Sequence, residues 1–225
     1  QIAKKHDLLL IQDAAQSLGG EYQGQPLGTQ TIISTMSFHT AKVMTTVEGG
    51  MIFTHDADFA KELRILRNQG ESGKYIHSHL GTNARMTDMS AAVGLAQKEK
   101  LSWMLEMRQS VAGKYNSHFH HQKQVRVTSC CRERSRNAYF FFPILVDNRE
   151  NVVERLKNKG IDTRVAYPMP VYDQELYRSG RAKFRKTPSP VAEKFTSEVL
   201  NLPIYPSLKD EQIDFIAKEV LEATI

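Results

Sequence analysis

The side chains with the clearest chemical potential lie in one stretch near the start of this sequence. Asp13 ends an apolar run that begins at Leu8, and Gln16 follows it three positions later. Ser37 ends a second short apolar segment, and Lys42 stands in the loop after it. In open α/β folds, ligands collect at the carboxyl ends of the strands, where these four side chains are expected. The sequence therefore predicts part of a ligand site here.

An acid and a lysine in this arrangement suit covalent chemistry on carbonyl compounds. A lysine amine is a nucleophile only when it can shed its proton, which burial or a nearby cation favours. Asp13 at the end of a buried strand would be costly without a cation to pair with. A lysine together with an acid that faces a pyridinium nitrogen is what pyridoxal phosphate chemistry requires. On these two residues alone, a solvated surface lysine is the better interpretation.

The hydrophobic pattern predicts the elements that must position these side chains. A continuous apolar run too short for a helix predicts a buried strand over 6–13, covered by helices on both faces. Further strands are predicted over 31–38 and 50–54, and a helix over 58–67. A long polar loop over 69–85 favours a functional role. The glycine pair that follows Glu48 is expected where φ is positive or packing is close.

The second half of the chain changes texture and predicts a second domain. Thr87 caps a predicted helix over about 87–118, and a helix that long often bridges two packed units. Beyond it the pattern predicts strands over 138–146, 161–166 and 200–204, and helices over 149–158, 191–199 and 208–223. We expect the remaining part of a large sheet domain over 1–105 and a small α+β domain over 106–225.

The composition excludes several classes of protein. Hydrophobic residues make up 40% and charged residues 24%, as in soluble globular proteins. The adjacent pair Cys130 and Cys131 supplies neither a disulfide framework nor metal-ligand spacing, so we expect a reducing cytoplasm and no metal. No apolar run approaches the roughly 20 residues of a membrane helix. The net charge of +5 is spread along most of the chain, so nucleic acid is a weak third option.

Several segments of the sequence, taken in order, resemble the signature segments of one family. They read Gln12-Asp13-Ala14-Ala15-Gln16-Ser17-Leu18-Gly19, Ser37-Phe38-His39-Thr40-Ala41-Lys42, Glu48-Gly49-Gly50, Gly81-Thr82-Asn83-Ala84-Arg85-Met86, Gly94-Leu95-Ala96-Gln97 and Asn201-Leu202-Pro203-Ile204-Tyr205-Pro206. The sequence thus resembles the DegT/DnrJ/EryC1/StrS family of pyridoxal-phosphate-dependent sugar aminotransferases, over the C-terminal portion of the family's length. The resemblance implies an α/β fold, the C-terminal part of a fold type I (aspartate aminotransferase-like) transferase, with a partial large-domain sheet plus a small α+β domain.

The resemblance also implies a role for each residue of the opening stretch. Lys42 would bind the cofactor covalently, and Asp13 would pair with its pyridine nitrogen. Gln16 matches a glutamine beside the phenolic oxygen of the cofactor, and Ser37 matches a hydroxyl that binds its phosphate. Asn83 matches an asparagine that reaches the phosphate in the partner subunit, which implies a homodimer with shared active sites.

Contacts with the substrate are expected from a smaller set of residues. His39, Tyr172 and Arg164 are the candidates, although a structural role suits His39 better than acid–base catalysis. Tyr172 stands where the family often has histidine after Pro-Leu, so sugar recognition there differs or the phenol takes over the hydrogen bond. Four arginines are candidates for contact with a diphosphate, with exposed solvated arginines as the alternative: Arg132, Arg134, Arg136 and Arg164.

The implied reaction moves an amino group from an amino acid such as glutamate to a keto sugar carried on a nucleoside diphosphate. Its product would serve polysaccharide or cell-surface glycan biosynthesis. Lysine at position 42 argues against the family's dehydratase branch, which has histidine there. The sequence begins at Gln1 and lacks the family's preceding phosphate loop and stacking aromatic residue, so the chain alone is expected to be inactive. The alternative is a catalytically inactive family member or fragment that acts only as a binding or structural module.

Overall fold

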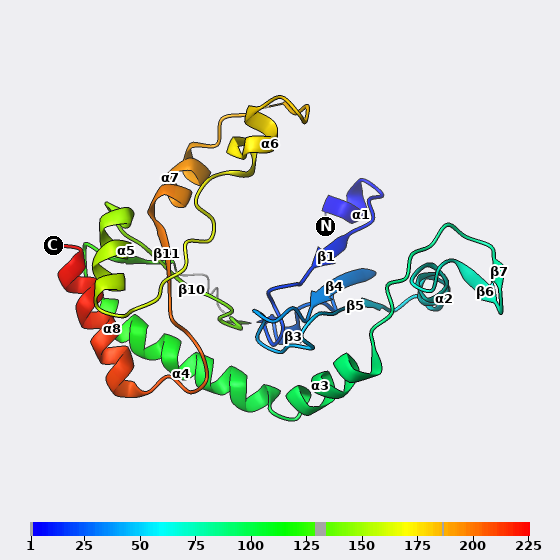
Figure 1. Cartoon of the computed structure of the whole chain (residues 1–225), viewed down its shortest axis with the longest axis horizontal. Coiled ribbons are helices and arrows are strands. Elements are labelled where there is room, and N and C mark those ends of the chain that lie inside the picture. The colour runs from blue at the N-terminus through cyan, green and yellow to red at the C-terminus, as the bar shows by residue number, and fades with distance from the viewer. Residues whose placement is uncertain (1, 129–133, 186) are drawn as a thin grey trace. The chain divides into compact units, whose positions relative to one another are not determined.

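The computed structural model describes residues 2–128, 134–185 and 187–225 (Figure 1). The chain divides into two compact units. Unit 1 consists of residues 1–105 together with 131–140, and unit 2 consists of residues 106–130 together with 141–225. Each unit is described by itself.

A three-stranded sheet in the order β1-β4-β5 forms the base of unit 1 (Figure 1). β1 (Ile11–Asp13) runs parallel to β4 (Ile33–Ser37), and Asp13 lies opposite Thr35. β5 (Gly50–Thr54) runs antiparallel to β4, and Gly50 lies opposite Ser37. The carboxyl ends of β1 and β4 and the start of β5 therefore meet at one edge of the sheet.

Shorter elements complete unit 1. Asp56 caps α2 by accepting hydrogen bonds from the backbone N–H groups of Asp58 and Phe59. A small hairpin occupies part of the segment predicted as a loop over 69–85. The elements are α1 (Ile2–Lys5), β2 (Glu21–Tyr22), β3 (Gln25–Pro26), α2 (Ala57–Leu66), β6 (Glu71–Gly73), β7 (Ile76–His77), α3 (Asp88–Lys98) and β9 (Ser135–Arg136).

The sheet of unit 1 is buried on one face only. Met36 of β4 and Phe38, which follows β4, pack with Ala14 and Met44 into a small core. The prediction of a buried strand over 6–13 is wrong, because only Ile11–Asp13 is strand and the side chains of residues 8–11 are 55–76% exposed. A continuous apolar run indicates a strand that is meant to be covered, but burial depends on what packs against it. Among the described residues, nothing buries this run.

Two helices replace the single helix predicted over 87–118. α3 begins after Thr87, which accepts a hydrogen bond from the backbone N–H of Ser90. It ends at Lys98, and α4 runs over Leu101–Phe119. Residues 97–100 are all polar or charged, so this stretch offers no apolar side chain that could pack a continuous helix against a core. Leu101 restores contact by packing against buried residues of unit 1.

Unit 2 has an antiparallel sheet in the order β11-β10-β8 with helices packed on it. Its core is formed by fully buried residues from the sheet and the helices, among them Tyr115, Phe142, Leu156, Leu200 and Ile213. The segment 161–166 is not a strand, since only Arg164 pairs there, with Asn201. The elements are β8 (Arg126–Val127), β10 (Phe142–Leu145), α5 (Arg149–Asn158), η1 (Val171–Asp173), α6 (Glu175–Arg178), α7 (Pro190–Glu198), β11 (Val199–Leu202) and α8 (Asp210–Ala223).

The glycine pair before β5 serves close packing. A Cβ on Gly49 would collide with the side chain of Thr46 and lie 2.9 Å from Cε of Met86. A Cβ on Gly50 would lie 3.0 Å from the carbonyl oxygen of Met36. The positive φ in this loop falls instead on Val47, at 71°. Of the two reasons expected for the pair, close packing is the one observed.

The described residues contain neither a membrane-spanning helix nor a metal-ligand cluster. No helix among them is long and apolar enough to cross a membrane. The described residues also contain no group of three or more His, Cys, Asp or Glu side chains that could hold a metal ion.

A matched pair of leucines tests the uneven burial. Replacing Leu9, which is 76% exposed, with serine should change the free energy of unfolding by less than about 0.5 kcal/mol. Replacing Leu156, which is fully buried, with alanine should lower it by about 2–5 kcal/mol. Urea denaturation followed by circular dichroism measures both. Equal losses for the two variants would show that the 8–11 run is covered in solution.

A matched pair of glycines tests the close packing before β5. Gly49→Ala should destabilise the chain by about 1–3 kcal/mol, because its Cβ overpacks against Thr46. Gly113→Ala lies in α4 with open space around the new methyl group, so it should stabilise by about 0.5–1 kcal/mol. Thermal unfolding of both variants is the measurement. A neutral Gly49→Ala would contradict the packing argument.

Candidate active site

The in-register pairing of β1 with β4 places an acid and two hydroxyls on the same face of the sheet. Asp13 lies opposite Thr35, and Ser37 follows Thr35 by two positions, so side-chain alternation keeps all three on one side. This face is opposite to the one that buries Met36 and Phe38. From the usual strand spacing and rise, the Cα atoms of Asp13 and Ser37 lie about 8 Å apart. The carboxyl ends of β1 and β4 therefore carry polar groups on the same face of the sheet.

A local hydrogen bond orients the carboxylate of Asp13, and the residue is exposed to solvent. Its Oδ1 accepts a hydrogen bond of 3.0 Å from the backbone N–H of Ala15, and the N–H of Ala14 donates to the carbonyl oxygen of Thr35 at 2.9 Å. The residue is exposed, which differs from the predicted buried strand end. The carboxylate is thus oriented by the turn after β1 and available to a cationic ligand.

Lys42 extends over an aromatic ring that the sequence argument did not include. The residue is half-buried, and its Nζ lies 4.7 Å from the centre of the Phe140 ring. An aromatic face attracts an ammonium group. Phe140 belongs to the second segment of unit 1, far along the chain from Lys42, and no sequence pattern connects the two. Only the fold could reveal this neighbour.

His39 lies within the Lys42 loop and bonds to that loop. Its Nδ1 accepts a hydrogen bond of 3.1 Å from the N–H of Ala41, and its Nε2 lies 3.6 Å from Oε1 of Glu48. The carbonyl oxygen of His39 accepts a 2.9 Å hydrogen bond from the N–H of Lys42. These contacts favour the structural role for His39 over contact with substrate.

Gln12 within β1 and Gln16 after it differ in their surroundings. Gln16 is exposed in the turn that follows Asp13, near the predicted ligand edge in sequence. Gln12 accepts a 2.9 Å hydrogen bond from the N–H of Gly28 through Oε1. Sequence reasoning gave Gln12 no role, but here it ties β1 to the segment before β4.

Asn83 lies in the loop between β7 and α3 and is exposed. Its backbone pairs with Asn68, and the Oδ1 of Asn68 accepts a 3.0 Å hydrogen bond from Nη1 of Arg85. Arg85 therefore anchors this loop. The side chain of Asn83 remains accessible to a second molecule.

The remaining substrate candidates are spread over both units. Arg164 and Tyr172 belong to unit 2, where Arg164 is exposed and pairs through its backbone with Asn201 at 3.1 and 2.9 Å. In unit 1, Arg134 is exposed and Nη1 of Arg136 lies 3.7 Å from Oε1 of Glu21. Arg132 lies outside the described residues.

Tyr172 is engaged with a carboxylate of its own unit. Its hydroxyl donates a 2.7 Å hydrogen bond to Oε1 of Glu193 on α7. This hydrogen bond raises the pKa of the Tyr172 phenol above its ordinary value, because it favours the protonated form. The phenol is therefore kept neutral as a hydrogen-bond donor.

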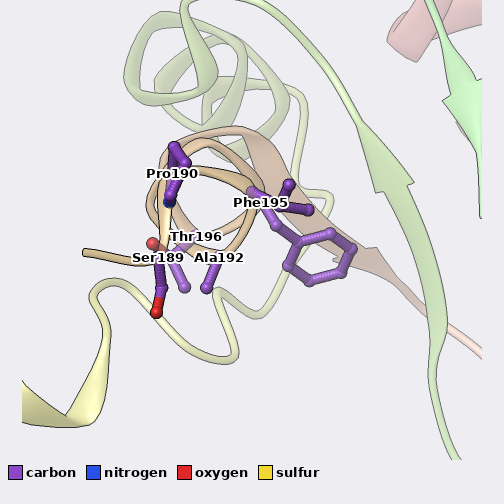
Figure 2. Close-up of a pocket in the computed structure, with 6 residues that line it drawn as sticks. Ser189, Pro190, Ala192, Phe195 and Thr196 are labelled. Carbon is purple, nitrogen blue, oxygen red and sulfur yellow. The ribbon is translucent and has the colours of Figure 1, made fainter. Parts of the chain in front are cut away.

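Among the described residues of unit 2, the hollows along α7 and beside α8 are both lined without the predicted site residues. One, of about 510 Å³, lies along α7, and Figure 2 shows Pro190, Ala192 and Phe195 around it. The other, of about 500 Å³, lies between the segment after α5 and the start of α8, with Ile161, Tyr205 and Phe215 among its lining residues. Neither hollow is lined by Lys42, Asp13 or Ser37.

The polar edge of unit 1 fits one side of a pyridoxal phosphate. A carboxylate oriented by Ala15 suits the cationic ring nitrogen, and the Ser37 hydroxyl on the same face suits the phosphate. Lys42 follows in the next loop, held by the turn at His39. These residues would hold the cofactor from one side only.

Comparisons with known proteins identify the family of the chain. The model of the DegT/DnrJ/EryC1/StrS aminotransferase family matches residues 1–221. The chain is 33% identical over 223 residues to a pleiotropic regulatory protein of Geobacillus stearothermophilus, covering 98% of this chain and 59% of that protein. It is 33% identical over 227 residues to GDP-perosamine synthase of Escherichia coli O157:H7, covering 99% of this chain and 60% of that protein.

Solved structures give the same result for the fold. DesV of S. venezuelae, solved in complex with a ketimine intermediate, matches with a TM-score of 0.92 at 31% identity, covering 98% of this chain and 59% of that one. Other matching structures were solved in a PLP form and a PMP form. The prediction of a partial fold type I transferase is confirmed, and the cofactor of the family is pyridoxal phosphate.

The chain spans about 60% of the length of the relatives that it matches. Within that span the match is continuous, from the strand that ends at Asp13 to the last helix. The chain therefore belongs to the DegT/DnrJ/EryC1/StrS aminotransferase family.

Proposed function

We propose that this chain carries the lysine-bearing side of the active site of a pyridoxal-phosphate-dependent transaminase. The observation that supports this most directly is the shared edge of β1 and β4, with Asp13 and Ser37 on one face and Lys42 in the following loop. The substrate class is a keto sugar linked to a nucleoside diphosphate, with an amino acid such as glutamate as the amino donor. GDP-perosamine synthase and a UDP-linked 3-oxo-sugar aminotransferase among the relatives support that class.

Each residue of the edge has a task in this proposal. When bound, pyridoxal phosphate withdraws electrons from the carbon that bears the transferred amine. Asp13 holds the proton on the ring nitrogen, and Ser37 binds the phosphate. The amine of Lys42 binds the cofactor between turnovers and moves a proton to and from the α-carbon of the amino donor.

The remaining assignments complete the proposal. Gln16 lies beside the phenolic oxygen of the cofactor, and Asn83 reaches the phosphate held by a partner subunit in a homodimer. The accessible side chain of Asn83, on a loop anchored by Arg85, supports a role between subunits. Arg164 and Tyr172 contact the substrate. The enzyme works in the cytoplasm, in polysaccharide or cell-surface glycan biosynthesis.

Site-selective labelling of Lys42 tests the proposed function. We incubate the chain with pyridoxal phosphate, reduce with borohydride and map the modified lysines by peptide mass spectrometry. Lys42 should be modified well above Lys98, an exposed lysine at the end of α3, because only Lys42 lies near the edge that binds the phosphate and ring. Binding without turnover is expected, since the chain spans about 60% of its relatives.

Two variants serve as controls for the labelling. Lys42→Ala should remove the selective adduct, and Lys98→Ala should leave it intact. Equal modification of Lys42 and Lys98 in the unchanged chain would contradict the proposal. It would favour the alternative of a catalytically inactive member that acts as a binding or structural module, which the exposed apolar run at residues 8–11 also suits.

The phenol of Tyr172 offers a separate test of the unit 2 assignment. Glu193→Gln removes the carboxylate that accepts from the phenol, so the pKa of Tyr172 should fall toward its ordinary value. A pH titration of tyrosinate absorbance measures it, with Tyr172→Phe as the subtraction control. An unchanged titration would show that Glu193 does not accept a hydrogen bond from the phenol of Tyr172 in solution.

A further inference from the structure

The backbone that carries Lys42 is shaped by a single tight turn. The N–H of Lys42 donates to the carbonyl oxygen of His39 at 2.9 Å, which closes a four-residue β-turn. Inside that turn, the N–H of Ala41 donates to Nδ1 of the His39 ring at 3.1 Å. The imidazole therefore braces the turn from within, in the way that Asn and Asp side chains brace turns through a backbone N–H two residues on.

This hydrogen bond fixes the state of the ring. A backbone N–H can only donate, so Nδ1 must accept and carries no proton. The proton of the neutral ring is then on Nε2. That nitrogen lies 3.3 Å from Oγ1 of Thr40 and 3.6 Å from Oε1 of Glu48. Nδ1 thus faces the backbone of the turn, and Nε2 lies near the side chains of Thr40 and Glu48.

The base of the loop is anchored independently of the ring. The N–H of Phe38 donates to the carbonyl oxygen of Gly49 at 2.8 Å, and the carbonyl oxygen of Phe38 accepts from the N–H of Thr46 at 2.9 Å. Phe38 is 4% exposed, so this anchor is a buried one. Lys42 lies beyond the anchor, and the turn at His39 sets the path of its backbone.

We propose that His39 is a positioning residue that holds Lys42 in its orientation through the Nδ1 bond to Ala41. It acts through the backbone and needs no contact with substrate or cofactor. The contact with Glu48 is secondary, because both side chains are largely exposed, at 49% and 77%, and surface pairs contribute little. The inference rests on the proposed function of Lys42 as the residue that binds pyridoxal phosphate.

Two substitutions separate the nitrogens of the ring. His39→Asn places an amide oxygen near the position of Nδ1, where it can accept from Ala41. His39→Gln places its amide near the position of Nε2, which keeps the reach to Glu48 and loses the bond to Ala41. Two quantities are measured in each variant: amide hydrogen exchange at Ala41 by NMR without cofactor, and the ratio of pyridoxal phosphate labelling at Lys42 to that at Lys98.

The Gln variant should show exchange at Ala41 faster by roughly two- to tenfold, as expected for the loss of one hydrogen bond. Its labelling ratio should fall by a similar factor, and the Asn variant should keep both quantities near those of the unchanged chain. If the Gln variant fails to fold, the Asn variant decides, since loss of Ala41 protection or of Lys42 selectivity there overturns the inference.

Other outcomes contradict the inference or separate it from the proposed function. If the Gln variant kept the Ala41 exchange and the labelling ratio of the unchanged chain and the Asn variant did not, the role would belong to the Glu48 contact. That result would overturn the proposal. Unchanged exchange and labelling in both variants would also overturn it. Absence of selective labelling at Lys42 in the unchanged chain, with Ala41 exchange still responding as expected, would refute the proposed function while the bracing of the turn stands.

Discussion

The parallel pairing of β1 with β4 is the constraint on which the candidate site depends. Three residue pairs fix its register, and that register alone puts Asp13 and Ser37 on the same face at the same edge. A slip of β1 by one residue would turn the acid to the face that carries Met36 and Phe38, away from the hydroxyls of β4. The polar cluster is therefore a consequence of strand register, and the buried alternation of β4 is what holds the register in place.

The sheet of unit 1 supplies only one side of the candidate site. One face of β4 is packed and the other carries the chemistry, so unit 1 presents a flat half-site with an exposed apolar strand end. The chain spans about 60% of its relatives, and those relatives include proteins described as synthases and as a regulatory protein. Membership in the family thus fixes the cofactor chemistry to be tested.

Local signals in the sequence predicted most elements well and their surroundings less well. β5 and α5 lie where the pattern placed them, since the glycines before Met51 and Gly160 after Asn158 mark clear limits. The long helix is interrupted where residues 97–100 offer no apolar side chain for packing. The buried strand over 6–13 failed because burial depends on packing partners that the local sequence does not contain. Phe140 under Lys42 is a contact of the same kind. Asp13, Ser37 and Lys42 remain predictions from resemblance that the geometry supports.

Val47, with its φ of 71°, gives the Lys42 loop a property of its own. A β-branched residue rarely adopts this region, and holding it there costs on the order of 1–3 kcal/mol. The loop that bears Lys42 therefore contains backbone strain. Its two ends are held by the backbone hydrogen bonds of Phe38 and by the close packing of Gly49. Lys42, the proposed nucleophile, thus lies in a loop whose backbone strain at Val47 could be relieved by a rearrangement of the loop.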